Sequence, residues 1–198
     1  AQITISAGTS GTVTMGAQGR STSGDDWSDA GVTFNLAPGG GGGGGGSSAT
    51  GGANCDASVT AVDSVDGWST YQLALTPTNG AANIYTIFGD TTTALTAPAA
   101  YQEAAPFGSN TGGVSPAFIA VSASAAVDSW LSVGITDGDN SGAISSIGID
   151  WDSWTDSAGL SSSDGAVFWM VPDDGPTGTA VVAQITIPAG TSGTVTMG

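Results

Sequence analysis

AQITISAGTSGTVTMG, residues 1–16, returns as AQITIPAGTSGTVTMG at residues 183–198, and the two copies differ only at Ser6 and Pro188. The period is 182 residues, that is 183 minus 1. A fixed period indicates a tandem array, and a period of this length indicates that the repeating unit is a whole domain. Because each copy contains two strand-like stretches, the duplicated element is a pair of strands.

Alternation of apolar and polar residues continues outside the repeat. In STYQLALT, Tyr71, Leu73 and Leu75 alternate with polar or small neighbours. Helix formers are scarce, since the chain has no Lys, one Arg and one Glu. We expect an all-β fold, an antiparallel β-sandwich of the immunoglobulin-like or jelly-roll-like type. The expected strands are residues 11–15, 31–36, 69–76, 84–88, 117–124, 129–135, 166–171, 179–187 and 193–197.

The chain divides into three parts. Residues 1–36 are a strand segment, residues 37–53 are a glycine-rich linker, and residues 54–198 are a β-sandwich body. The first segment is too short to build its own core. It therefore packs on its own body or completes the sheet of the adjacent unit by strand donation, which covers an exposed edge. Its expected buried anchors are Ile3, Ile5, Val13 and Met15.

The charge balance excludes several partners. The formal net charge is -16, and Arg20 is the only basic residue. Phosphate binding requires Lys and Arg, so nucleic acid is excluded as a partner. An anionic membrane surface repels the chain, and no stretch approaches the 18 or so apolar residues that a membrane-inserted helix needs. The composition predicts a secreted protein that is extracellular or attached to the cell surface.

DGDNSG, residues 137–142, resembles the start of a calcium loop. Asp137, Asp139 and Ser141 supply oxygen atoms at alternate positions, and a glycine allows the turn. The twelfth position is Gly148 instead of Glu, and the nearest later carboxylate is Asp150. An Asp-Gly hairpin turn explains the same residues. Because the chain is so acidic, we favour Ca²⁺ as a cofactor, with candidate ligands Asp137, Asp139, Ser141 and Asp150.

Two further patterns point to carbohydrate. In WDSWTDS, Trp151 and Trp154 lie beside carboxylates and form a candidate sugar-stacking platform, although filling a core poor in Leu and Phe is the stronger interpretation. The chain has no Asn-X-Ser/Thr acceptor, so covalent glycans are expected on hydroxyl groups. Loop solubility explains the same hydroxyl clusters. The candidate attachment segments are Thr91, Thr92 and Thr93, the pair Ser115 and Pro116, and Ser161, Ser162 and Ser163.

Enzyme chemistry is poorly supported by the residue types. The chain has no His and no Lys, and Cys55 is its only cysteine. Nucleophile pairs of the Ser-His or Cys-His kind therefore have no base. Carboxylate chemistry remains, with Asp150 and Asp152 as the pair to test. We expect that the protein is not an enzyme.

Four segments resemble repeat domains in predicted secreted proteins of unicellular algae and related protists. They are YQLALTPTNGAANIYTIFGD, PAAYQEAAPFGSNTGG, ITDGDNSGAISSIGIDWDSW and GAVFWMVPDDGP, and the similarity spans most of residues 59–198. The resemblance implies an extracellular, glycosylated setting, such as an environmental extracellular filament, and it implies no activity.

Together these observations predict a structural subunit of an extracellular filament or surface coat. Copies of the chain would assemble head to tail through the tandem repeats and through strand donation, and would carry O-glycans. The alternative is a calcium-dependent carbohydrate-binding or adhesin module, which binds glycans through the tryptophans.

Overall fold

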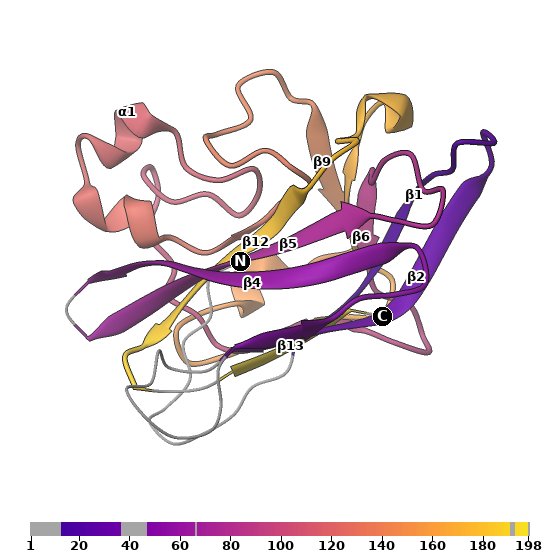
Figure 1. Ribbon diagram of the computed structural model, residues 1–198. Coiled ribbons are helices and arrows are strands. Elements are labelled where there is room, and N and C mark those ends of the chain that lie inside the picture. Colours follow the sequence, from indigo (N-terminus) through magenta and orange to yellow (C-terminus); the bar gives the residue numbers. More distant parts are fainter. Residues whose placement is uncertain (1–12, 37–46, 66, 191–192, 198) are drawn as a thin grey trace.

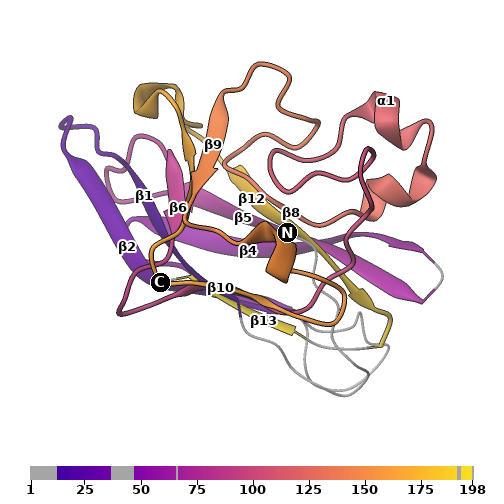
Figure 2. The same cartoon turned by 180° about the vertical axis from the view of Figure 1, so that it is seen from behind.

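A computed structural model describes residues 13–36, 47–65, 67–190 and 193–197. Nearly all of its regular structure is β-strand, arranged in two antiparallel sheets that pack in a sandwich-like manner (Figures 1 and 2). The expected all-β fold is confirmed. No helix in the described part of the chain is long and apolar enough to cross a membrane.

The larger sheet follows the order β10-β7-β1-β6-β11-β9, and β2, β13 and β3 join it through β2. Its described strands are β1 (Val13–Arg20), β2 (Asp26–Leu36), β3 (Ser48–Thr50), β6 (Thr86–Phe88), β7 (Leu95–Ala97), β9 (Ile144–Ile147), β10 (Leu160–Ser162), β11 (Ala166–Trp169) and β13 (Gly193–Met197).

The smaller sheet has the order β4-β5-β12-β8. Its strands are β4 (Cys55–Val65), β5 (Trp68–Pro77), β8 (Trp130–Leu131) and β12 (Ala180–Pro188). Strand β12 lies between β5 and β8, so its backbone is paired along both edges at Ala183 and Gln184. The core between the two sheets includes Phe34, Leu73, Ile87 and Ile185, each 0% exposed.

The structure differs from the expected strands in several places. The segment 117–124 contains the helix α1 (Pro116–Ile119) and the start of a 3-10 turn (Ala123–Val127), because Pro116 at the first helical position fixes a helical φ. Strand β8 is shorter than the expected 129–135. The strands β4, β7, β9 and β10 were not expected. Ser48–Thr50, within the predicted linker, is a strand paired with β2.

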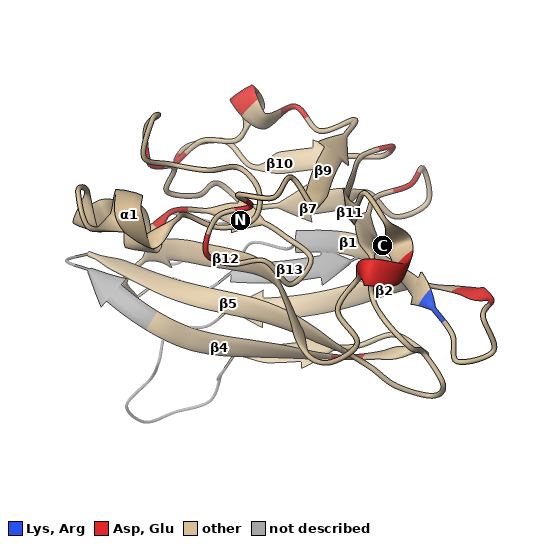
Figure 3. Cartoon of the chain, turned by 90° about the horizontal axis from the view of Figure 1, so that it is seen from above, with Lys and Arg blue, Asp and Glu red and all other residues tan. Residues whose placement is uncertain are grey.

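Acidic residues lie mainly in the loops and turns at the ends of the strands (Figure 3). Arg20, at the end of β1, pairs with Asp26 and Asp173, both at 2.9 Å. It therefore links the β1–β2 hairpin to the loop that follows β11. These groups are at least one-third exposed, so the pairs contribute little to stability.

Two buried polar residues, Asn83 and Asp29, attach the β1–β2 hairpin to the body. The side chain of Asn83 accepts the Arg20 backbone N–H at 2.7 Å, and the Trp27 indole N–H donates to the Asn83 carbonyl at 3.1 Å. On β2, Asp29 is 5% exposed and accepts both the backbone N–H of Asn54, at 2.6 Å, and its side-chain amide, at 2.8 Å. In this single chain, the described residues 13–36 thus pack on their own body.

We predict that Asp29→Ala lowers the free energy of unfolding by about 1–3 kcal/mol, because the Asn54 backbone N–H loses its acceptor. Urea unfolding measures the change. The matched control is Asp56→Ala, which removes an exposed carboxylate from β4 and should change stability by less than about 0.5 kcal/mol. Equal effects in the two variants would show that the Asp29 contact does not hold β2 in place.

Candidate assembly site

The middle of β2 pairs with three strands. Phe34 has one partner in each of β1, β13 and β3, namely Val13, Val195 and Ala49. All three strands run antiparallel to β2. A strand has two edges, so three partners at one residue exceed what backbone hydrogen bonding can satisfy at once.

Strands β1 and β13 have the same register on β2. Thr33 pairs with Thr14 and with Thr196, and Val32 pairs with Met15 and with Met197. Each pair of partners is 182 residues apart, which is the period of the repeat. Because the two strands have the same sequence, direction and register, we infer that they are alternatives for one edge of β2. Strand β3 then pairs with the other edge.

The first half of the repeated segment has a comparable position in the smaller sheet. AQITIP, residues 183–188, forms most of β12, which pairs with β5 along this whole stretch. Strand β8 covers the other edge of β12 at Ala183 and Gln184. The start of AQITI is therefore internal to the smaller sheet.

The two positions are close in sequence and lie in different sheets. Strand β12 ends at Pro188 and β13 begins at Gly193, so a short connection carries the chain from the smaller sheet to the larger one. The repeated segment therefore contributes one strand, β12, to the smaller sheet and one strand, β13, to the larger sheet. We call the two positions that these strands occupy, beside β5 and beside β2, the closing site.

Of the four predicted anchors, the structure describes Met15 and the backbone of Val13. Met15 is 0% exposed, and Val13 pairs with Phe34. Ile3 and Ile5 lie outside the described residues. Their counterparts in the second copy, Ile185 and Ile187, are both 0% exposed. Sequence reasoning missed the acceptor residues on β2, because a strand's own sequence carries no signal that identifies its pairing partner.

The predicted calcium ligands do not form a cluster. The described residues contain no group of three or more His, Cys, Asp or Glu placed to hold a metal. Asp137 and Asp150 are exposed. Asp139 accepts hydrogen bonds from its own loop, from the Ser141 hydroxyl at 3.0 Å and from two backbone N–H groups, and this arrangement is that of a capped turn. Calcium binding stays a prediction.

The environment of Asp139 agrees with a turn-capping role. Burial alone would raise the pKa of its carboxyl group. The hydrogen bonds from the backbone N–H groups of Ile144 and Ala143, and from Ser141, outweigh burial and lower this pKa below its usual range. The carboxylate is therefore held in its charged form by the protein itself.

The two tryptophans of the predicted sugar platform face the protein. Trp154 is 2% exposed and donates its indole N–H to the Pro98 carbonyl at 2.9 Å. Trp151 is half-buried and donates to the Ser146 hydroxyl at 3.2 Å. The rings lie 6.2 Å apart. Since the Trp154 ring has no open face, this pair forms part of the core, as the stronger interpretation expected.

The candidate glycan sites differ in accessibility. Ser162 is 7% exposed, and its hydroxyl donates to the Gly148 carbonyl at 2.7 Å, which leaves no room for a sugar. Ser115 and Thr93 are half-buried. The remaining candidates, together with the proline beside Ser115, are exposed: Thr91, Thr92, Pro116, Ser161 and Ser163.

Cys55 is 0% exposed, so its thiol is not presented to a neighbouring chain in this fold. Burial is the largest effect that raises the pKa of this thiol, to about 12. A thiol in this state is inert toward disulfide exchange at neutral pH.

Comparisons of the chain with family models, with curated proteins and with solved structures found no match. The resemblance to algal and protist repeat domains stays a prediction.

A second buried carboxyl group organises the loop region before β8. Asp128 is 1% exposed and accepts the backbone N–H groups of Glu103, at 2.8 Å, and Ser109, at 2.7 Å. Burial raises its pKa from 3.8 to about 6, although the hydrogen bonds from Glu103, Ser109 and Ser129 act in the opposite direction. The folded state therefore binds a proton more readily at this group than the unfolded state does.

This raised pKa predicts that acidification stabilises the fold. Between pH 7 and pH 4.5 the folded chain gains a proton at Asp128 that the unfolded chain mostly lacks, so the free energy of unfolding should rise by about 2 kcal/mol from this group. Urea unfolding across this range tests the effect. Asp128→Asn should remove that part of the pH dependence, and an unchanged pH dependence would contradict the assignment.

Proposed function

We propose that the chain is a structural subunit that assembles head to tail into an extracellular filament or surface coat. The observation that carries the proposal is the identical register of β1 and β13 on β2. The fold has one closing site, and the chain holds two copies of the segment that fits it. One copy is thus left over for a neighbouring unit.

Chain continuity indicates how neighbouring units connect. In a tandem array, the copy at 183–198 of one unit is followed by residues 17–36 of the next unit. The short connection between β12 and β13 keeps this copy on the body that precedes it. The next unit's β1–β2 hairpin would then complete the preceding body, in the place that the chain's own residues 13–36 occupy when it is alone.

This arrangement produces a linear assembly. Each body accepts a hairpin on one side and supplies its own hairpin on the other, and such a head-to-tail contact extends without closing unless the rotation between units forms a ring. The run Gly39–Gly46, which precedes β3, becomes the connection between completed domains. Exposed hydroxyls, such as those of Thr92 and Ser161, remain available on the surface for O-glycans.

A tandem chain of two units, residues 1–182 followed by residues 1–198, tests the proposal. A protease site replaces part of Gly39–Gly46 in the second unit. If the second unit's hairpin completes the first body, cleavage there separates the first domain, with that hairpin, from the second body, since no other connection joins them. Size-exclusion chromatography with light scattering should then show two smaller species.

The control is the single 198-residue chain with the same protease site. Here no neighbour is present, so the released fragment of residues 1–36 should stay bound to its own body through Asp29 and Trp27. If the cleaved tandem chain also stays together as one species, each unit keeps its own hairpin, and donation between units is wrong.

A further inference from the structure

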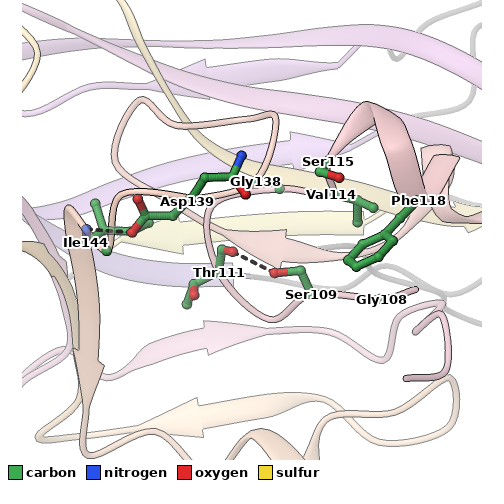
Figure 4. A pocket seen from close by; sticks show the side chains of 12 residues that line it. Gly108, Ser109, Thr111, Val114, Ser115, Phe118, Gly138, Asp139 and Ile144 are labelled. Atoms are coloured by element: carbon green, nitrogen blue, oxygen red, sulfur yellow. Dashed lines mark hydrogen bonds between the residues drawn. The ribbon is translucent and has the colours of Figure 1, made fainter. Parts of the chain in front are cut away.

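A cavity of about 470 Å³ opens where two loops cross beside α1. One loop supplies Ser109, Thr111 and Ser115, and the other supplies Asp139 and Asn140. Figure 4 shows the Phe118 ring at one end of the cavity, Asp139 and Ile144 at the other, and Ser109 and Thr111 along one wall. The filament proposal assigns no role to this cavity.

The cavity is built into the fold. Gly113 and Gly138 both have positive φ, at 77° and 92°, and a Cβ on Gly113 would lie 2.1 Å from the Thr136 carbonyl oxygen. The backbone N–H of Gly138 donates to the Gly112 carbonyl at 2.9 Å, which joins the two loops. Glycine is therefore required for this close approach, and the walls have a defined geometry before any ligand arrives.

An aromatic ring is presented at the cavity. Phe118 is 45% exposed, and Phe107 supports it from the side, with ring centroids 6.1 Å apart at an angle of 82°. Phe107 restricts the orientation of the Phe118 ring, and the exposed part of that ring is available to contact an apolar surface.

Several polar groups of the lining are free to bind. Within the described residues, the side chains of Thr111, Ser115 and Asn140 make no hydrogen bond that the structure records. Two are hydroxyls and one is an amide, so together they donate and accept. The Ser109 hydroxyl is held by the Thr111 carbonyl at 2.6 Å, and Asp139 is held by its own loop.

The lining selects a class of ligand. It contains no Lys or Arg, and Asp139 is negative, so a phosphate or carboxylate ligand has no counter-charge here. Asp139 is the only acidic residue of the lining, and its oxygen atoms already accept three hydrogen bonds, which is a poor ligand set for a divalent cation. A neutral molecule that combines an apolar face with several hydroxyl groups fits both the ring and the polar wall.

We propose that this cavity binds a neutral sugar. The C–H face of a pyranose ring stacks on Phe118, and its hydroxyl groups bond to Thr111, Ser115 and Asn140. This binding is independent of Trp151 and Trp154 and needs no calcium. It gives the chain a carbohydrate-binding activity separate from its role in assembly.

Saturation-transfer NMR on the full chain tests the proposal, with methyl glycosides of glucose, mannose, galactose and N-acetylglucosamine at about 10 mM each, in the presence of EDTA. At least one of these sugars should receive saturation from the protein. Phe118→Ala should weaken its binding about fivefold, since an aromatic stacking contact is worth about 1 kcal/mol. Asn140→Ala, a substitution of an exposed loop residue, should weaken binding several-fold.

The control is Val121→Ala, which truncates a 73% exposed apolar side chain just after α1 that does not line the cavity. It should bind as the unmodified chain does. Absence of saturation transfer to all four sugars overturns the proposal. So does a bound sugar whose affinity is the same in the Phe118→Ala and Asn140→Ala variants, both checked for an unchanged circular dichroism spectrum.

Discussion

Backbone hydrogen bonding along the two edges of β2 determines how the larger sheet is completed. Backbone groups on each edge need a hydrogen-bonding partner, and each edge accepts one strand. Strand β3 pairs with one edge, while β1 and β13 match the other edge residue for residue. The first half of the same segment, residues 183–188, forms most of β12, which lies between β5 and β8 in the smaller sheet. One copy of the segment matches both positions, and under the proposed head-to-tail assembly the other copy belongs to a neighbouring unit.

Local alternation of large apolar residues was enough to predict some of the strands. Tyr71, Leu73 and Leu75 mark β5, which the structure confirms. Strand β4 was missed because its sequence, CDASVTAVDSV, alternates small residues with polar ones and has no large side chain to mark a face. The apolar run after Pro116 was expected to be a strand, and short apolar runs of this kind do not distinguish strand from helix.

The sites were less predictable than the strands, for a physical reason. The duplicated segment is visible in the sequence, but its acceptor on β2 is separated from β13 by most of the chain. The DGDNSG motif was visible too, yet Asp139 uses its oxygen atoms to cap its own loop. The cavity beside α1 combines Phe118 with Asn140, and only the crossing of two loops places such residues together.

The distribution of charge has a consequence for any close assembly of this chain. The chain carries a net charge of -16, and most acidic residues of its described part lie in the loops and turns that connect the strands (Figure 3). Neighbouring domains repel one another over about one Debye length, roughly 8 Å at physiological ionic strength. Each copy also brings an excess of mobile cations, and their osmotic pressure draws in water. A coat made of such domains would behave as a polyelectrolyte gel, swollen in fresh water and thinner in brine.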